Sequence, residues 1–409
     1  MIKVYVNKPH KNKHEYTFKC SIQFIYNSIF PIKRFAKYSL LNRGYDNRNE
    51  CIFGFKAKNF DIPHSQVWDS IYPLFYLTRR GGPLYGKDDN HAVIEFDFPV
   101  LKEAKDFFIK RASKFGIYLD VKADFYSKEF ELETKENALS FSGGKDSGLL
   151  YGLLRELGKT PELFSTINVS ARNYENLPIK KSVALGEDLA SRLIPAFISN
   201  FKNIYYGAAL DELVYREPWQ QYYDQGSQEA AIEFSNFLKS IGIEKSFRSP
   251  AGVLPSNLIQ SILYKRYPDL YRKQFSVKKG KKTKKNLHIS LCKIYHGIDY
   301  SNQSSEKLFK TLLSDFVEKQ LKYPNLFGFR DHREIFHKEM RSIIYRMREH
   351  PLFSEVKDDI PDSWNADWID QIHLYLKPDI DEDILTIFKE YAPIADNNVW
   401  QPDHANAQC

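Results

Sequence analysis

Residues 138–158 read ALSFSGGKDSGLLYGLLRELG, and this stretch decides the fold that the sequence predicts. The apolar segment Ala138–Phe141 predicts a short strand, and Gly148–Leu157 has the apolar periodicity of an amphipathic helix. The loop between them consists of Ser142, Gly143, Gly144, Lys145, Asp146 and Ser147. A strand, a glycine-bearing loop and a helix in this order are typical of a phosphate-binding turn in an α/β protein.

Lys145 and Asp146 give this loop its chemistry. The two glycines before them allow a sharp turn and a close approach of the backbone to a ligand. The N-terminus of the following helix attracts anions, and the serine at each end of the loop adds a hydroxyl donor. Lys145 adds a mobile positive charge, whereas Asp146 would repel a phosphate unless a divalent cation lay between them. We therefore expect Asp146 to contact Mg²⁺ and the loop to bind a nucleotide.

The spacing of the loop is not that of the GxxxxGK[ST] loop of other ATPases. It resembles the PP-loop of the ATP pyrophosphatases, in which SGGxDS directly follows a strand. That superfamily is similar in fold to the adenine nucleotide alpha hydrolases, and its members cleave ATP between the α and β phosphates. The resemblance implies ATP and Mg²⁺ as cofactors, Lys145 and Asp146 as catalytic residues, and ATP contacts from all six loop residues. A glycine- and serine-rich turn without a ligand is the alternative explanation.

Within the superfamily, residues 138 to about 297 are most similar to the 7-cyano-7-deazaguanine synthases. Arg248-Ser249-Pro250 follows an expected strand at Glu244–Phe247, as a proline-containing loop does in that family. Ser290-Leu291-Cys292 corresponds loosely to the Ser-Cys pair of the family. The resemblance implies that Arg248 and Ser249 contact the substrate. Diverged members of this kind occur in bacterial antiviral gene sets, which by analogy suggests a defence role.

The chain also departs from that family. Its cysteines, Cys20, Cys51, Cys292 and Cys409, lie far apart and form no CxxC pair. The four-cysteine zinc site of the 7-cyano-7-deazaguanine synthases is therefore not expected here. Residues 167–172 read INVSAR, where that family usually has an acidic, glutamine-containing turn. Its adenine and substrate contacts in this turn are therefore not transferred.

Composition limits the class of protein. With 43% hydrophobic and 27% charged residues, the chain is typical of a soluble globular protein. No apolar run has the length of a membrane span, and the first residues lack the apolar core of a signal peptide. We therefore expect a cytoplasmic protein that does not bind a membrane. The net charge of +7 weakly favours an anionic partner.

The order of the expected elements indicates three domains in the 409 residues. Residues 1–131 are expected to form an N-terminal α+β domain, which is a candidate docking site for a partner protein. After the polar stretch Leu132–Asn137, strands and helices alternate over residues 138–300. This alternation predicts an α/β fold, a PP-loop domain with a parallel doubly wound sheet. Residues 301–409 are expected to form a mainly helical region.

The individual elements are assigned from periodicity and residue type. In the N-terminal domain, strands are expected at Ile2–Val6, Tyr16–Phe24, Cys51–Phe55 and Ala92–Phe98, with a helix within Val100–Phe115. After the loop helix, we expect strand Leu163–Val169, helix Lys180–Ser199, strand Asn203–Gly207 and helix Gln228–Ile241. The later helix candidates are Pro255–Tyr267, Ser304–Leu321, His332–Arg348 and Ile380–Tyr391.

Acidic residues follow the expected strand Asn203–Gly207. Asp211 and Glu212 lie just beyond its carboxyl end. Ligands of parallel sheets bind beyond the carboxyl ends of the strands, so Asp211 is a candidate Mg²⁺ ligand beside Asp146. The alternative is a helix N-terminus with favourably placed acidic residues.

Six lysines fall within the eight residues Lys278–Lys285, which read KKGKKTKK. Such a run could bind nucleic acid, and Tyr267, Tyr271 and Phe275 just before it could stack on bases. A solvated loop between two helices is the alternative explanation of the lysines.

Taken together, the sequence predicts an ATP-dependent ligase that adenylates a carboxylate and passes it to nitrogen. The absence of a CxxC pair argues against sulfur transfer, and Ile2 stands where an internal glutaminase would begin with cysteine. The nucleophile is therefore expected to be ammonia or an amine. A purine-like carboxylate such as a deazapurine would suit a pocket lined by some of the 26 Tyr and 30 Phe. The alternatives are a tRNA-modifying adenylating enzyme and a scaffold that binds ATP without turnover.

Overall fold

The structure is a computed structural model of the whole chain. The residues that it describes are 2–12, 15–24, 50–57, 62, 65–78, 84, 91–113, 116–128, 130, 135–165, 176–185, 199–207, 228–254, 256–274, 284–295, 303–322, 334–365 and 381–391. Contacts divide the chain into two compact units, each made of three segments. Unit 1 consists of Met1–Ser142, Gly158–Tyr206 and Trp219–Arg248, and unit 2 of Gly143–Leu157, Gly207–Pro218 and Ser249–Cys409. The domain borders expected near residues 131 and 300 stay predictions.

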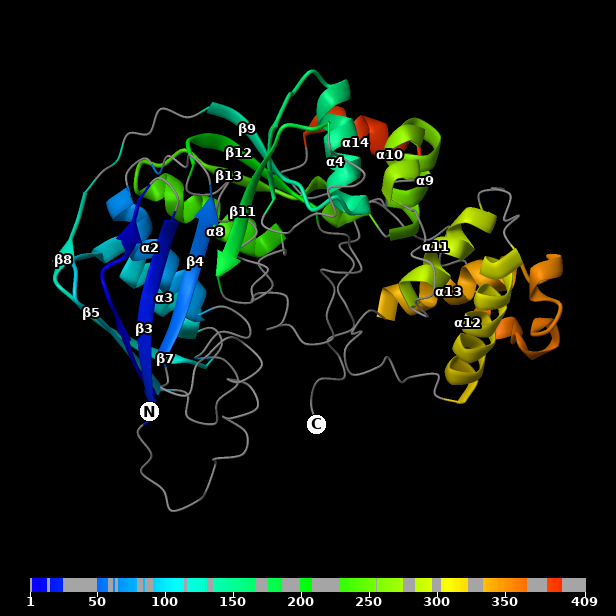
Figure 1. Ribbon diagram of the computed structural model, residues 1–409, viewed down its shortest axis with the longest axis horizontal. Helices are drawn as coiled ribbons and strands as arrows, with labels where there is room; N and C mark the ends of the chain where they lie inside the picture. Colours follow the sequence, from blue (N-terminus) through cyan, green and yellow to red (C-terminus); the bar gives the residue numbers. More distant parts are fainter. Residues whose placement is uncertain are drawn as a thin grey trace, which may run out of the picture. The chain divides into compact units, whose positions relative to one another are not determined.

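Unit 1 is built on one 11-stranded sheet with the order β13-β12-β9-β10-β11-β4-β3-β1-β5-β7, and β2 pairs with β3 outside this path (Figure 1). The strands are β1 (Ile2–Val6), β2 (His10–Lys11), β3 (Glu15–Phe24), β4 (Glu50–Ala57), β5 (His91–Phe96), β7 (Tyr118–Lys122), β9 (Lys135–Ser140), β10 (Glu162–Ser165), β11 (Ile179–Leu185), β12 (Phe201–Tyr206) and β13 (Ser246–Arg248). Two further short strands, β6 (Val100–Leu101) and β8 (Phe125–Tyr126), pair with each other.

The strands around β9 are parallel. Both neighbours of β9, which are β10 and β12, run parallel to it, and β13 runs parallel to β12. The carboxyl ends of these four strands therefore lie along one edge of the sheet. On the other side, β11 pairs parallel with β10 and antiparallel with β4, which joins the strands of the N-terminal region to the same sheet. The predicted α/β class is confirmed, and the doubly wound arrangement stays a prediction.

Helices α2 (Ser65–Thr78), α3 (Lys102–Ser113) and α8 (Gln228–Ser240) supply an aromatic core in unit 1. Rings from all three helices and from β13 lie within contact distance of one another: Phe75, Phe107, Phe108, Phe234, Phe237 and Phe247. The tightest of these pairs is Phe107 of α3 with Phe237 of α8, which stack with ring centroids 4.3 Å apart. Helices far apart in the sequence therefore share one core, which large aromatic side chains stabilise through their buried area.

Unit 2 is helical. Its described helices are α4 (Lys145–Glu156), α9 (Ser256–Arg266), α10 (Pro268–Gln274), α11 (Lys284–Tyr295), α12 (Gln303–Lys322), α13 (Glu334–Arg346) and α14 (Glu382–Lys389), with the 3₁₀ turn η3 (Pro250–Val253) before α9. Leu291 of α11, Phe309 of α12 and Met340 of α13 are among the residues of its apolar core. Every described element after residue 250 is helical, as the sequence predicts.

The expected helix over Lys180–Ser199 is wrong for its first residues, because Ile179–Leu185 forms strand β11. Its backbone is paired on both sides, with β10 and with β4, and such pairing overrides weak local preference. Residues 186–198 lie outside the described part of the chain. Helix α2 was not expected from the sequence, since Pro73 inside it argues against a helix interior.

Candidate nucleotide-binding site

The chain approaches the loop from the carboxyl edge of the parallel strands in unit 1. Ser140, the last residue of β9, is level with Phe164 of β10 and with Tyr206 of β12. One residue later, the Phe141 N–H donates to the Phe164 carbonyl oxygen at 2.7 Å, which extends the ladder to the start of the loop. Ser142 follows and is exposed. The predicted ATP-binding serine therefore lies at the edge of the sheet where ligands of parallel sheets bind.

Unit 2 begins with the rest of the loop and helix α4. Gly143 has a φ of 71°, the left-handed conformation that glycine adopts without the steric cost of a side chain. Gly144 is the N-cap of α4 and brings no side chain to hydrogen bond the first turn. The first N–H groups of a helix have no partner four residues earlier, so they carry partial positive charge. The two glycines thus leave this end of α4 without a side-chain cap.

Gly207 is a site residue that the sequence reasoning missed. It follows β12 and approaches the first turn of α4 within unit 2. A Cβ atom added at Gly207 would lie 2.5 Å from the Ser147 backbone N and 2.8 Å from the Asp146 Cβ. Any side chain here would occupy the space in front of that turn. A glycine directly after the strand that pairs with the loop strand was the signal available in the sequence.

Lys145 and Asp146 form an ion pair with each other. The Lys145 Nζ atom lies 2.6 Å from the Asp146 Oδ1 atom, and both side chains are sheltered, with exposed fractions of 16% and 15%. Adjacent residues of a helix diverge by about 100°, so this contact depends on the conformations of the two side chains as well as on their adjacency. The two predicted catalytic residues are therefore together, and in this arrangement their charges neutralise each other.

The other predicted site residues are distributed as follows. Ser147 is buried, and its hydroxyl donates to the Gly144 carbonyl oxygen at 3.3 Å, so it supports the loop. Arg248 ends β13 at the carboxyl edge of the unit 1 sheet, level with Tyr205. Asp211 lies outside the described residues.

Ser249 belongs to unit 2 and is the N-cap of η3, which packs against α4. Its side chain is only 1% exposed, and its Oγ atom has no hydrogen-bond partner among the residues that the structure describes. A buried hydroxyl without a partner is costly, which makes Ser249 a candidate for a bond to a ligand.

The opposite end of α4 is held by a charged cluster. Glu156 accepts a hydrogen bond from Arg266 Nε at 2.9 Å and one from the Tyr267 hydroxyl at 2.6 Å, and Arg266 also contacts Glu390 at 2.6 Å. The Arg266 bond lowers the pKa of Glu156 to about 2. The Tyr267 ring also fills the space beside Gly152 of α4, where an added Cβ would lie 2.9 Å from it. These contacts fix the helix that carries the loop.

A buried polar cluster joins α9 and α11 around Cys292. Its Sγ atom is 3.5 Å from Asn257 Oδ1 and 3.6 Å from His288 Nε2, and His288 Nδ1 is 3.0 Å from Gln260 Nε2. A chain of donors satisfies these contacts: Gln260 donates to His288, His288 to Cys292, and the thiol to Asn257. The cluster is therefore consistent with a structural role.

The donor set at the loop fits a metal-bound nucleotide better than a protein-only metal site. Among the described residues, no group of three or more His, Cys, Asp or Glu side chains could hold a metal ion. Mg²⁺ commonly binds one or two carboxylates and completes its coordination with substrate phosphates and waters. Asp146 supplies one carboxylate, and the first turn of α4 supplies the positive environment for phosphates.

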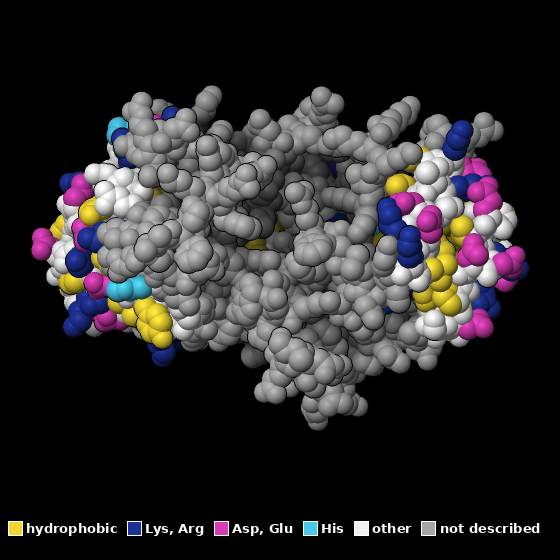
Figure 2. Space-filling view, turned by 90° about the horizontal axis from the view of Figure 1, so that it is seen from below, with side chains coloured by type: hydrophobic (Ala, Val, Ile, Leu, Met, Phe, Trp, Pro, Cys, Tyr) yellow, Lys and Arg dark blue, Asp and Glu magenta, His cyan; other side chains and the backbone are white. Residues whose placement is uncertain are grey.

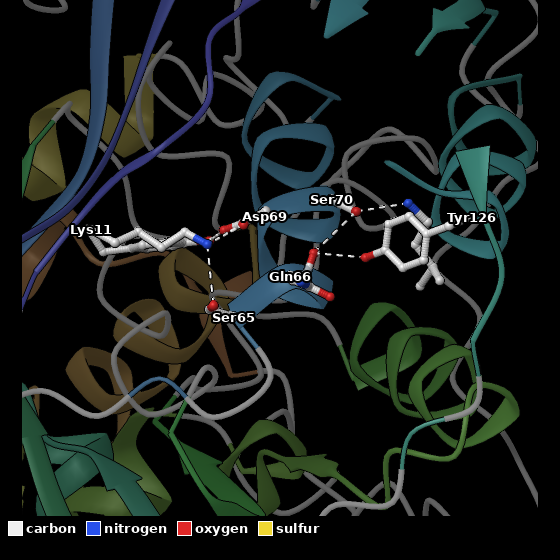
Figure 3. A network of polar contacts seen from close by, with 8 residues as sticks. Lys11, Ser65, Gln66, Asp69, Ser70 and Tyr126 are labelled. Carbon is white, nitrogen blue, oxygen red and sulfur yellow. Dashed lines mark hydrogen bonds and ion pairs between the residues drawn. The ribbon is translucent and has the colours of Figure 1, made fainter. Parts of the chain in front are cut away.

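A second buried polar network lies in the N-terminal region of unit 1, around Asp69 of α2 (Figure 3). Lys11 of β2 forms an ion pair with Asp69 and donates to Ser65 Oγ at 3.3 Å, and the Tyr16 hydroxyl donates to Asp69 Oδ1 at 2.8 Å. Burial raises the pKa of Asp69, although its bonds with Lys11 and Tyr16 oppose this effect. The carboxylate thus has donors on both oxygens and ties β2 and β3 to α2.

The same helix also makes hydrogen bonds with strands β6 and β8. Ser70 Oγ accepts a hydrogen bond from the Leu101 backbone N–H at 2.8 Å, and the Tyr126 hydroxyl donates to the Gln66 carbonyl oxygen at 3.0 Å (Figure 3). Leu101 lies in β6 and Tyr126 in β8. These contacts explain why polar residues of α2 are retained in the interior.

Lys245 is a buried cation of unit 1 that the sequence reasoning missed. Its side chain is 2% exposed, and its ammonium donates to the carbonyl oxygens of Ser199 and Phe201, the latter at 2.9 Å. The Nζ atom also lies 5.9 Å from the centroid of the Trp68 ring of α2. Burial lowers the pKa of Lys245 to about 7. No property of the sequence around it marks this lysine as buried.

The lysine run Lys278–Lys285 is mostly outside the described residues, and only Lys284 and Lys285 are placed, as the first residues of α11. On the face shown in Figure 2, basic and acidic side chains are interspersed over the described residues. Nucleic-acid binding through the run stays a prediction. In the described part of the chain, no helix is both long and apolar enough to cross a membrane.

Comparison of the chain with protein-family models, with curated proteins and with solved structures finds no match.

Proposed function

We propose that this protein binds ATP with Mg²⁺ at the loop Ser142–Ser147 and cleaves it to AMP and pyrophosphate, as PP-loop ATP pyrophosphatases do. The observation that carries the proposal is the uncapped first turn of α4. Gly143, Gly144 and Gly207 bring no side chains to it, and the ion pair of Lys145 and Asp146 lies within it. The sequence SGGKDS after a strand supports the same function.

ATP supplies an adenylyl group: a substrate carboxylate oxygen attacks the α-phosphorus, pyrophosphate leaves, and an amine or ammonia then attacks the acyl carbon and releases AMP. Lys145 and the first-turn amides of α4 stabilise the negative charge that develops on the departing pyrophosphate. Asp146 would hold Mg²⁺, which would help to neutralise the negative charge of the phosphates. Arg248, the last residue of the parallel strand β13, and Ser249, which follows it, contact the carboxylate substrate, for which a deazapurine is our candidate.

The test uses ATP labelled at the α-phosphate and a search for labelled products. The wild-type protein with Mg²⁺ and pooled small-molecule carboxylates should release labelled AMP together with pyrophosphate. Asp146→Asn should reduce this release at least about 100-fold, which is the usual effect of removing one group that stabilises a transition state. The matched control is Asp106→Asn, because Lys105–Asp106 is the same dipeptide on α3, with the aspartate 58% exposed.

The outcomes separate the alternatives. Formation of labelled ADP and orthophosphate instead of AMP would contradict the proposal, as would equal loss in the Asp106→Asn control. ATP binding without any cleavage would indicate a scaffold. Copurifying RNA whose affinity falls steeply with salt would favour a tRNA-modifying enzyme, and deletion of Lys278–Lys285 should then weaken that binding.

A further inference from the structure

The ion pair between Lys145 and Asp146 has a consequence for how the loop accepts a nucleotide. The two side chains are the only charged ones of the loop Ser142–Ser147. At 2.6 Å, with exposed fractions of 16% and 15%, the pair is partly shielded from water, and shielding strengthens the attraction between opposite charges. In this state the lysine charge is directed at the aspartate.

Another Lys-Asp dipeptide, on α3, provides a comparison. Lys105 and Asp106 of α3 are 3.5 Å apart, and Asp106 is 58% exposed. Lys105 instead places its ammonium 4.6 Å from the centroid of the Phe125 ring. Sequence adjacency alone therefore does not produce the short, sheltered contact of the loop pair, which depends on its place in the first turn of α4.

We propose that the loop pair is a latch that a divalent cation opens, so that Lys145 reaches a phosphate only after Asp146 has engaged the cation. This inference rests on the proposed function. The pair has no net charge, whereas the pair with a divalent cation on Asp146 has a net charge of +2. Free ATP therefore meets a loop in which the lysine is engaged and the carboxylate repels phosphate.

The latch differs from simple repulsion by Asp146 in a way that can be measured. If Asp146 only repels phosphate, its neutralisation improves the binding of free ATP whether or not Lys145 is present. If Asp146 also restrains Lys145, the improvement depends on the lysine. A double-mutant cycle measures this dependence, because coupling between contacting residues appears as non-additivity of the two substitutions.

The experiment measures ATP affinity by calorimetry, in EDTA and in Mg²⁺, for the wild-type protein, Asp146→Asn, Lys145→Met and the double variant. In EDTA, Asp146→Asn should bind ATP about tenfold more tightly than the wild type, in the range of coupling between residues in contact. The same substitution in the Lys145→Met background should change the affinity less than about twofold. Lys145→Met alone should change the ATP affinity little in EDTA and should lower it strongly in Mg²⁺. Asp106→Asn is the control for the change in net charge.

An equal gain from Asp146→Asn in both backgrounds would overturn the latch while leaving the proposed function intact. Failure of the wild-type protein to bind ATP in Mg²⁺ would overturn the proposed function and the latch with it. Circular dichroism of the four variants verifies that each is folded.

Discussion

Among the residues that the structure describes, two lysine–aspartate pairs are sheltered from water, and their surroundings differ. Asp69 in the N-terminal region is bound by Lys11 and by the Tyr16 hydroxyl, and these partners come from strands distant in sequence. Asp146 pairs with its sequence neighbour in the first turn of α4. The first pair joins elements of the fold, whereas the second joins none. Whether a buried charged side chain has a structural role therefore depends more on which elements it connects than on the length of its ion pair.

The largest expected effect is a difference in pyrophosphate release between variants of Lys145 and of Lys11. Lys145→Met should lower pyrophosphate release at least about 100-fold, because under the proposed function it removes a charge that stabilises the transition state. Lys11→Met should leave the rate per folded molecule within about twofold, since the described partners of Lys11 are Asp69 and Ser65 of α2. Measurements of AMP formation at saturating ATP and Mg²⁺ check both. A similar loss of activity in the two variants would contradict the assignment of a catalytic role to Lys145 and of a structural role to Lys11.

The contacts of Lys245 differ from those of both pairs, because its buried ammonium lies against carbonyl oxygens and an aromatic ring. Burial lowers its pKa from 10.5 to about 7. Between these values the unfolded chain binds more protons than the folded one, so the free energy of unfolding rises with pH. The rise between pH 7 and pH 10 should be about 3 kcal/mol larger in the wild type than in Lys245→Met. Urea unfolding at the two pH values measures it, and equal slopes would show that Lys245 is not desolvated in solution.

Removal of Asp69 should lower the stability of the protein more than removal of Asp146, although Asp146 is the one expected to affect activity. Asp69→Ala strands the Lys11 ammonium and the Tyr16 hydroxyl in the interior and should cost about 2 kcal/mol, less than a fully buried pair because Lys11 is 28% exposed. Asp146→Ala should cost under about 1 kcal/mol, since the released lysine can turn to water. Urea denaturation of both variants gives the two values. A larger cost for Asp146→Ala would assign the loop pair a structural role.

The smallest effect concerns the helix that carries the loop pair. Gly152→Ala improves helix propensity but places a Cβ against the Tyr267 ring, so it should destabilise the protein by about 1 kcal/mol. In a Tyr267→Ala background the clash is absent, and the same substitution should become neutral or stabilising. Thermal unfolding of the wild type, the two single variants and the double variant shows whether Gly152→Ala raises or lowers stability in each background. Destabilisation by the same amount in both backgrounds would show that the ring does not restrain α4.

The sequence predicts the parts of the fold that have local signals. The strand and helix on either side of the loop Ser142–Ser147 are found within a few residues of their expected bounds, and so is helix α12. Strand β11 was missed because its pairing with β10 and β4 comes from distant segments. The approach of Gly207 to the first turn of α4 joins residues far apart in the sequence, so no local pattern records it.

The charged interior was harder to predict than the loop. Asp69 lies on helix α2, which contains Pro73, and Lys245 lies between helix α8 and strand β13. Neither residue belongs to a motif, and composition gives no sign that a particular charged side chain is buried. Burial of a charge depends on which backbone and side-chain partners the tertiary structure brings to it.

The antiparallel pairing of β4 with β11 bears on how the polypeptide is made. A ribosome delivers β3 and β4 long before Ile179–Leu185 exists, so during synthesis the outer side of β4 offers unsatisfied peptide groups to any extended chain nearby. In fragments that stop near residue 131, this edge of β4 stays unpaired because β11 is absent. Expression of truncated versions is therefore expected to yield insoluble material, and nascent chains have reason to recruit chaperones until the later strand emerges.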